Sequence, residues 1–273
     1  PSTEFNGTTA LAIGSTFKLW ILLALDDKLR TSNGALSWDS KLALRDEGKS
    51  LPSGVMQNLA SGSEFALREF AGKMISISDN TATDHLLEFV TRDGAVRAQK
   101  ATGVNAMPKP GFINTRELFA IKILANDAER ALLRTGTQRQ IDGLLADLRK
   151  RPLQLQDAEG WTKPRHLEFE WYATPHQLCR LMTELGARGQ WDANSELLKI
   201  LGENPGIKID KARWAYAGFK GGSEPGVINL TWLLQKPDRS WHFVTVGVND
   251  PNQALDEGAI VGLAETIVNQ LVP

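Results

Sequence analysis

The chain has 273 residues, of which 42% are hydrophobic and 23% charged, and its formal net charge at pH 7 is -1. This composition is typical of a globular protein with a sizeable core, built as one large domain or two closely associated ones. The net charge gives no indication of a nucleic acid or an anionic membrane as a partner. The longest apolar run (residues 19–25) is too short to cross a bilayer, and the single cysteine excludes an intrachain disulfide.

The first predicted elements surround a serine and a lysine. Residues 8–13 predict a short strand, and residues 15–30, which contain no Gly or Pro, predict a buried helix that begins after Gly14. Ser15 and Lys18 are three residues apart, so a helix places them on one face.

This S-x-x-K pair has a chemical interpretation. Burial would lower the pKa of the Lys18 amine, and a neutral amine can take the proton of the Ser15 hydroxyl. The free N–H groups at the start of the helix would stabilise a developing oxyanion. A single S-x-x-K match is weak evidence, however, because many helices contain one by chance.

The central part of the chain is predicted to be mostly helical. Residues 36–62 indicate loop with brief helix or strand, and helices are expected from about residue 63, over 81–89, over 115–128, and from 174 to about 185. The tripeptide Ser78-Asp79-Asn80 directly precedes the helix over 81–89. Ser and Asp satisfy free N–H groups at a helix start, so the tripeptide has a capping interpretation beside a catalytic one.

After residue 206 the pattern changes to β-rich runs. Residues 214–220, 227–235 and 241–248 predict three antiparallel strands of one sheet, and residues 254–271 predict a closing helix. The first of these strands leads into Lys220-Gly221-Gly222-Ser223.

Three motifs therefore follow one another along the chain: S-x-x-K at 15–18, S-D-N at 78–80, and K-G-G-S at 220–223 in place of K-T-G. Together they resemble the signature of class A β-lactamases and penicillin-binding proteins, the penicillin-recognising serine hydrolases, over nearly the whole chain. The stretches 14–20, 74–87 and 218–227 look most like the β-lactamase-fold, cephalosporin-esterase-type proteins of clavam antibiotic biosynthesis.

The resemblance implies an α+β fold, in which an antiparallel sheet flanked by helices faces an all-helical lobe. The active site would lie in the groove between them. We expect one catalytic unit over residues 1–273, with an α/β lobe from 1–30 and 207–273 and a helical lobe from 31–206. Relatives usually carry a helix and a strand or two before the nucleophile, so we expect a missing N-terminal segment. The chain shows no signal peptide, and its compartment stays open between the cytoplasm and export with a leader removed.

The resemblance also assigns catalytic roles. Ser15 would be the nucleophile that forms an acyl-enzyme, and Lys18 its activating base. Ser78 would relay a proton to the leaving group, with Lys220 beside it.

Four further residues would bind the substrate. Asn80 would donate a hydrogen bond to an amide carbonyl, and Gly221 and Gly222 would let the substrate lie along the strand edge. The backbone N–H groups of Ser15 and Ser223 would form the oxyanion hole, and the Ser223 hydroxyl would help to hold a substrate carboxylate.

The chain departs from the class A pattern at the step that releases the product. Class A β-lactamases carry a glutamate in an E-x-x-L-N loop after S-D-N, which activates the deacylating water, and no such motif occurs here. Counted forward from S-D-N, the residues nearest to the expected position of this glutamate are 114–118, which look like a helix start. Counted back from Thr174, the glutamates within reach are Glu159, Glu168 and Glu170. Residues 227–235 also lack the arginine that lactamases often use for a substrate carboxylate. Both absences argue against an efficient lactamase.

The sequence thus predicts a serine hydrolase acting on a small β-lactam-like or ester substrate, with esterase or slow β-lactamase activity. Two alternatives stay open: a penicillin-binding or sensor-type domain that is acylated but not turned over, and an efficient class A β-lactamase. The intact motifs disfavour a structural domain with a vestigial site. The four histidines show no metal-ligand spacing, so we expect neither a metal nor a cofactor. The oligomeric state stays open.

Overall fold

A three-stranded antiparallel sheet lies at the centre of the computed structural model, which describes residues 3–50, 53–154, 157 and 161–271. Its strands, in spatial order, are β5 (Tyr216–Glu224), β6 (Val227–Gln235) and β7 (Trp241–Asn249). The α+β fold class and the antiparallel sheet predicted from the sequence are confirmed. The first strand begins two residues later than expected and continues through the K-G-G-S run to Glu224.

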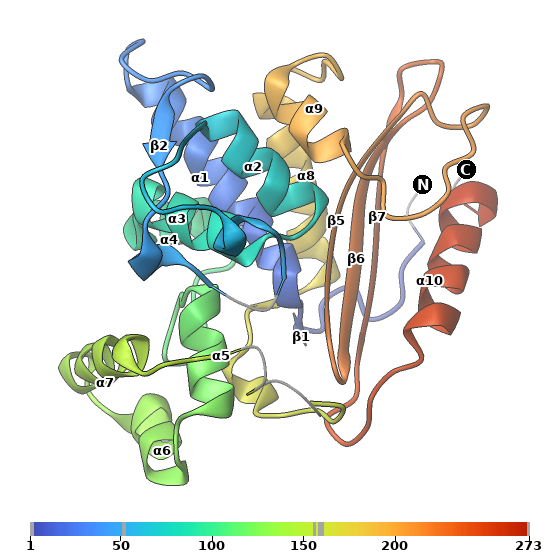
Figure 1. Ribbon diagram of the computed structural model, residues 1–273. Coiled ribbons are helices and arrows are strands. Elements are labelled where there is room, and N and C mark those ends of the chain that lie inside the picture. Colours follow the sequence, from blue (N-terminus) through green and yellow to red (C-terminus); the bar gives the residue numbers. More distant parts are fainter. Residues whose placement is uncertain (1–2, 51–52, 155–156, 158–160, 272–273) are drawn as a thin grey trace.

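Helices cover both faces of this sheet (Figure 1). On one face, α10 (Glu257–Thr266) and the π-helical turn Ile267–Leu271 contribute Ala264 and Val268 to an apolar cluster with Trp232. On the other, α8 (Pro175–Arg188) packs against β6 and β7, and α9 (Glu196–Gly202) against β5. Because both faces are covered, β6 is buried along almost its whole length, which explains its nearly continuous apolar sequence.

A second group of helices surrounds α1 (Lys18–Thr31), whose run from Leu19 to Leu25 is buried in the main core. The group consists of α2 (Leu67–Ser76), α3 (Asn80–Val90) and α4 (Arg92–Ala101). The helix α1 contacts all three and also α8. The division into an α/β lobe and a helical lobe stays a prediction; α8, which that division assigns to the helical lobe, packs on the sheet.

Three further helices form a separate cluster between α4 and α8 in the chain (Figure 1): α5 (Thr115–Ile123), α6 (Asp127–Thr135) and α7 (Gln138–Lys150). The helix predicted over 115–128 is thus interrupted, because Asn126 caps a new helix by accepting a hydrogen bond from the Glu129 N–H.

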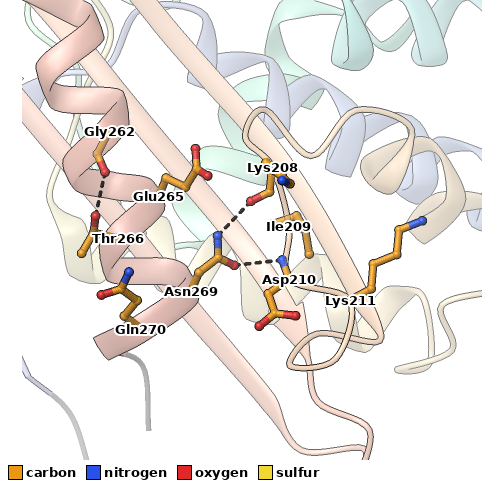
Figure 2. Close-up of a pocket in the computed structure, with 9 residues that line it drawn as sticks. All are labelled: Lys208, Ile209, Asp210, Lys211, Gly262, Glu265, Thr266, Asn269 and Gln270. Carbon is orange, nitrogen blue, oxygen red and sulfur yellow. Dashed lines mark hydrogen bonds between the residues drawn. The ribbon is translucent and has the colours of Figure 1, made fainter.

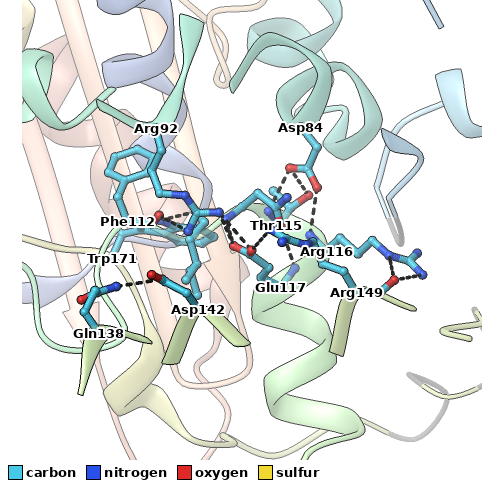
Figure 3. A network of polar contacts seen from close by, with 12 residues as sticks. Asp84, Arg92, Phe112, Thr115, Arg116, Glu117, Gln138, Asp142, Arg149 and Trp171 are labelled. Carbon is cyan, nitrogen blue, oxygen red and sulfur yellow. Dashed lines mark hydrogen bonds and ion pairs between the residues drawn. The ribbon is translucent and has the colours of Figure 1, made fainter. Parts of the chain in front are cut away.

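A buried carboxylate fixes the start of α5 (Figure 3). Glu117 is fully buried, and its side chain accepts hydrogen bonds from Arg92, Arg149 and the Asn114 N–H. Asp84, on α3, accepts hydrogen bonds from the backbone N–H groups of residues 115 and 116. These contacts join α5 to α3, α4 and α7, so α5 is a rigid element of the fold.

Short strand pairs complete the structure. The strand predicted over 8–13 is only β1 (Leu11–Ala12), which pairs with β4 (Tyr172–Ala173); β2 (Lys41–Ala43) pairs with β3 (Glu64–Ala66). The Asn249 side chain accepts a hydrogen bond from the Ala12 N–H at 2.7 Å and donates one to the Ala12 carbonyl at 3.0 Å. The Asn249 side chain thus bonds to both backbone groups of Ala12, in addition to the pairing of Ala12 with Tyr172 in β4.

Among the described residues, no helix is both long enough and apolar enough to span a bilayer.

Two surface hollows lie outside the predicted site. One, of about 610 Å³, lies between the loop 208–211 and the C-terminal helical turns, where the Asn269 amide bridges the Lys208 carbonyl and the Asp210 N–H (Figure 2). The other, of about 750 Å³, is lined by α3, α7 and the loop near residue 47. None of the described residues that line them belongs to the three motifs.

Candidate active site

Ser15 lies in a single turn of 3₁₀ helix, Gly14–Phe17, and Lys18 is the first residue of α1. The sequence predicted one continuous helix from Ser15. The difference begins at Gly14, whose φ of +48° lies in the left-handed region, so the chain turns sharply before the helix starts. The Lys18 N–H donates to the carbonyls of Ser15 and Thr16, which fastens the turn to α1.

The Lys18 side chain is fully buried and bonded to the S-D-N tripeptide. Its Nζ donates to the Ser78 carbonyl at 2.7 Å, the Asn80 Oδ1 at 2.7 Å and the Ser78 Oγ at 3.0 Å. Burial lowers the pKa of Lys18 well below its usual range, and the charge of Lys220 lowers it further, against the opposite influence of Asp84 and Asp79. This is the direction that a base acting on a serine requires.

Ser78 lies between the two lysines of the motifs. The Lys220 Nζ is 3.1 Å from the Ser78 Oγ, on which Lys18 also converges. Burial lowers the pKa of Lys220 to about 7. Two amines that lose their protons readily therefore share one hydroxyl oxygen, an arrangement in which a proton can pass along the chain of three groups.

The backbone of Ser78 is held in a strained conformation. Its φ of +57° is uncommon for a residue other than glycine, and it turns the carbonyl toward Lys18 and the Ser53 hydroxyl. Asp79 holds this turn: its Oδ1 accepts the Ala82 N–H at 2.8 Å, and its Oδ2 accepts the Val55 N–H at 2.6 Å. Asp79 is therefore the helix cap that the sequence indicated, and it also holds the loop at residues 55–56 beside the site.

The strand β5 brings the third motif against the nucleophile turn. Lys220 donates to the Gly221 carbonyl at 2.5 Å. Because backbone groups alternate along a strand, the Ser223 N–H faces the same side as that carbonyl, and β5 is an edge strand. A side chain at Gly222 would lie 2.2 Å from the Ile13 carbonyl oxygen and 2.4 Å from the Ser15 nitrogen. The absent side chain of Gly222 therefore makes room for the backbone of the nucleophile turn, which is a different reason for this glycine from the one the sequence suggested.

The structure brings Lys18, Ser78, Asn80 and Lys220 into direct contact, and it places Gly222 against Ser15. Within the described part of the chain, the Ser15 side chain makes no hydrogen bond. Catalytic hydrogen bonds of this kind are often long or misaligned without a substrate.

Gly222→Ala tests the close approach of β5 to Ser15. We expect a loss of acylation rate of about 10²-fold or more, since a displacement of about 1 Å at a reacting centre costs that much. Gly143→Ala on α7 is the matched control, because no atom lies within 4 Å of the added carbon. The measurement is the rate of labelling with a chromogenic ester, beside thermal unfolding; a Gly222→Ala variant as fast as the wild type would contradict the predicted contact.

The two described candidates for a deacylating glutamate, Glu168 and Glu170, form ion pairs away from Lys18. Glu168 is partly exposed and pairs with Arg134, and Glu170 is buried and pairs with Lys122. Glu159 lies outside the described residues. Among the described residues, no carboxylate bonds to the Lys18 Nζ, and no group of three or more His, Cys, Asp or Glu side chains is placed to hold a metal ion.

Sequence reasoning missed two features beside the site. The ring of Trp171 stacks on Phe17 with centroids 3.6 Å apart, and the Trp171 carbonyl accepts the Ile13 N–H at 2.9 Å. Lys122 is buried between Glu170 and Glu224. A lysine near the end of an amphipathic helix ordinarily indicates a solvent-exposed side chain, so nothing local in the sequence distinguished it.

Comparison with known proteins gives one family and many similar folds. A family model described as the beta-lactamase enzyme family matches residues 2–271.

The β-lactamase of Sphaerobacter thermophilus has a TM-score of 0.64 and 20% identity, with 100% of this chain and 88% of that chain covered. The β-lactamase of Francisella tularensis has a TM-score of 0.65 and 15% identity, with 98% and 89% covered. A PBP-A variant, solved as an acyl-enzyme complex with penicillin G, has a TM-score of 0.62 and 16% identity, with 98% and 84% covered. These likenesses show the fold; no curated protein matches the chain.

Proposed function

Because this chain belongs to the beta-lactamase enzyme family and is a hydrolase of the serine β-lactamase type, we propose that it acts through an acyl-enzyme on Ser15, with small β-lactam-like or ester substrates. The observation that carries the proposal is the position of the Ser78 hydroxyl, 3.0 Å from the Lys18 Nζ and 3.1 Å from the Lys220 Nζ. This contact joins residues from all three motifs in one buried chain of proton-bearing groups.

We infer an acylation step in which these groups move a proton. Neutral Lys18 takes the proton of Ser15 as the Ser15 oxygen bonds to the substrate carbonyl carbon. The N–H groups of Ser15 and Ser223 stabilise the resulting oxyanion. The C–N bond of a lactam or the C–O bond of an ester then breaks, and the proton reaches the leaving group through Ser78. The positive charge of Lys220, when protonated, favours substrates that carry a carboxylate.

Apolar groups at the edge of the site favour a substrate with an apolar portion. Ile77 directly precedes Ser78 and is 42% exposed, and Val55, which is hydrogen-bonded through its backbone to Asp79, is 46% exposed. Large apolar side chains left in water beside a polar centre are common at ligand sites.

We expect slow deacylation of β-lactam adducts. A water that attacks the acyl-enzyme needs a positioned base, and the Lys18 amine bonds to serine and asparagine groups rather than to a carboxylate in the described residues. Ester substrates, including the acetyl ester side chain of a cephalosporin, should be turned over faster than the lactam ring is opened and released, as in an esterase of the clavam type.

Mass spectrometry over time, with a chromogenic cephalosporin and a nitrophenyl ester, measures this partition. A long-lived adduct with the cephalosporin and rapid turnover of the ester are expected, and an adduct that persists with both substrates would favour the sensor-type alternative. Glu159→Gln, Glu168→Gln and Glu170→Gln should not selectively prolong the adduct. A variant among them that acylates normally but no longer deacylates would identify a deacylating glutamate and favour an efficient β-lactamase.

A further inference from the structure

A buried charge cluster lies next to the proposed site without belonging to it. Lys122, on α5, donates from its Nζ to the Oε1 atoms of Glu170 and Glu224, and the side chains of Lys122 and Glu170 are fully buried. The ring of Trp161 covers the ammonium, with the Nζ 5.6 Å from its centroid. Charges buried in this way need close partners, and the cluster supplies them.

Burial and the neighbouring charges shift the pKa values of this cluster. Burial alone would lower the pKa of Lys122, but the two glutamates outweigh it and raise that pKa, so the lysine stays charged. Burial and the neighbouring Glu170 raise the pKa of Glu224 to about 8, against the opposite influence of Lys122.

Glu224 is one residue away from a proposed oxyanion donor, and Glu170 is one residue away from a side chain that contacts the nucleophile turn. Glu224 directly follows Ser223 in β5. Glu170 directly precedes Trp171, whose carbonyl accepts the Ile13 N–H and whose ring stacks on Phe17, so Trp171 contacts both flanks of the nucleophile turn. Lys122 thus bridges β5, which carries the Ser223 N–H, and the segment 170–171, which contacts both flanks of the turn that carries the Ser15 N–H.

The lysine itself is attached to a fixed support. Its helix α5 is anchored by the buried Glu117, which bonds to Arg92 and Arg149, and by the Asp84 contacts to residues 115 and 116 (Figure 3). The nucleophile turn and β5 also touch each other at Gly222, where there is no room for one additional carbon atom. Their relative position is therefore sensitive to a small shift.

We propose that Lys122 is a positioning residue for the oxyanion hole: it holds β5 at Glu224 and, through Glu170 and the adjacent Trp171, the nucleophile turn in the relative position that acylation requires. The proposal rests on the proposed function, since it takes Ser15 and Ser223 as the oxyanion donors. It assigns Lys122, Glu170 and Glu224 no contact with the substrate.

The test uses variants that leave no unpaired buried charge. Glu224→Leu removes the link to β5 and leaves the Lys122–Glu170 pair intact. The triple variant Lys122→Met/Glu170→Gln/Glu224→Gln removes all the charges. Arg151→Met, which breaks partly buried and exposed ion pairs to Glu129 and Asp147 far from the motifs in the sequence, is the control. Lys122→Arg keeps a cation between the two carboxyl groups and tests for rescue.

The readouts are the acylation rate constant and the Michaelis constant for a nitrophenyl ester, with thermal unfolding measured in parallel. We expect the acylation rate to fall about 10- to 100-fold in Glu224→Leu and in the triple variant, because a displacement of about 1 Å costs about 10²-fold. The Michaelis constant should change little, Arg151→Met should match the wild type, and Lys122→Arg should recover part of the rate.

The outcomes distinguish a failure of the positioning role from a failure of the proposed function. A folded Glu224→Leu or triple variant that acylates at the wild-type rate would show that the cluster contributes only to stability, and would overturn the positioning role. Peptide mapping of the wild-type adduct reports independently on the nucleophile. If the wild-type adduct is not on Ser15, the proposed function fails, and the role of Lys122 in an oxyanion hole fails with it.

Discussion

Ser15→Ala is expected to abolish covalent labelling by penicillin-type and fluorophosphonate probes and to reduce turnover by about 10⁴- to 10⁶-fold. The variant removes the only atom that bonds to the substrate carbonyl in the proposed reaction, and no neighbouring hydroxyl can replace it without moving the backbone. Ser78 already lies between two lysines, and its carbonyl is held by Lys18 and Ser53.

The measurement is intact-protein mass spectrometry with peptide mapping of the adduct. Ser61→Ala, at an exposed serine, is the matched control and should label like the wild type. Undiminished labelling of Ser15→Ala would show that another residue is the nucleophile.

Lys18→Met is expected to lower the rate of acylation by about 10²- to 10⁴-fold, the usual contribution of a positioned base. Methionine fills most of the volume of the lysine, so the loss reports on the amine more directly than Lys18→Ala does. The unfolding temperature should be measured beside the rate, because Asn80 and the Ser78 carbonyl each lose a buried partner.

The pH dependence of the acylation rate shows in which protonation state Lys18 acts. Lys18 accepts a proton only when neutral, and its pKa is lowered by burial and by Lys220. The wild-type acylation rate should therefore be low where Lys18 is protonated and rise with pH through its lowered pKa, and Lys18→Met should lose that part of the rise. Lys100→Met, at an exposed lysine, should keep the wild-type profile. A Lys18→Met variant with the wild-type rate and profile would assign the base elsewhere.

Local sequence patterns predicted those parts of the fold that depend on local forces. Runs rich in β-forming residues and separated by turns predicted the three strands, and the apolar run over residues 19–25 predicted the buried helix α1. The spacing of the motifs also identified Lys18, Ser78 and Lys220, which the structure places in contact.

Features that depend on distant partners could not be predicted in this way. The partners of β1 are Tyr172, Ala173 and the Asn249 side chain, all far along the chain, so its true extent could not be read locally. The cluster of Lys122 with two glutamates joins three segments, and no periodicity relates them. Glycine is needed at position 222 because the backbone of the nucleophile turn packs against it, and this contact joins segments that are far apart in the sequence.

The way the nucleophile turn is held also determines when the site can form during synthesis. Ser15 is made before its partners, since the carbonyl that holds Ile13 belongs to Trp171, the strand against it carries Gly222, and the side chain that bonds to Ala12 belongs to Asn249. Contacts over such sequence separations form late, because the loop entropy must be lost before they can stabilise the fold. A chain that ends before Asn249 therefore carries the serine without the complete site, and reactivity toward an acyl donor begins only when these distant segments have folded together.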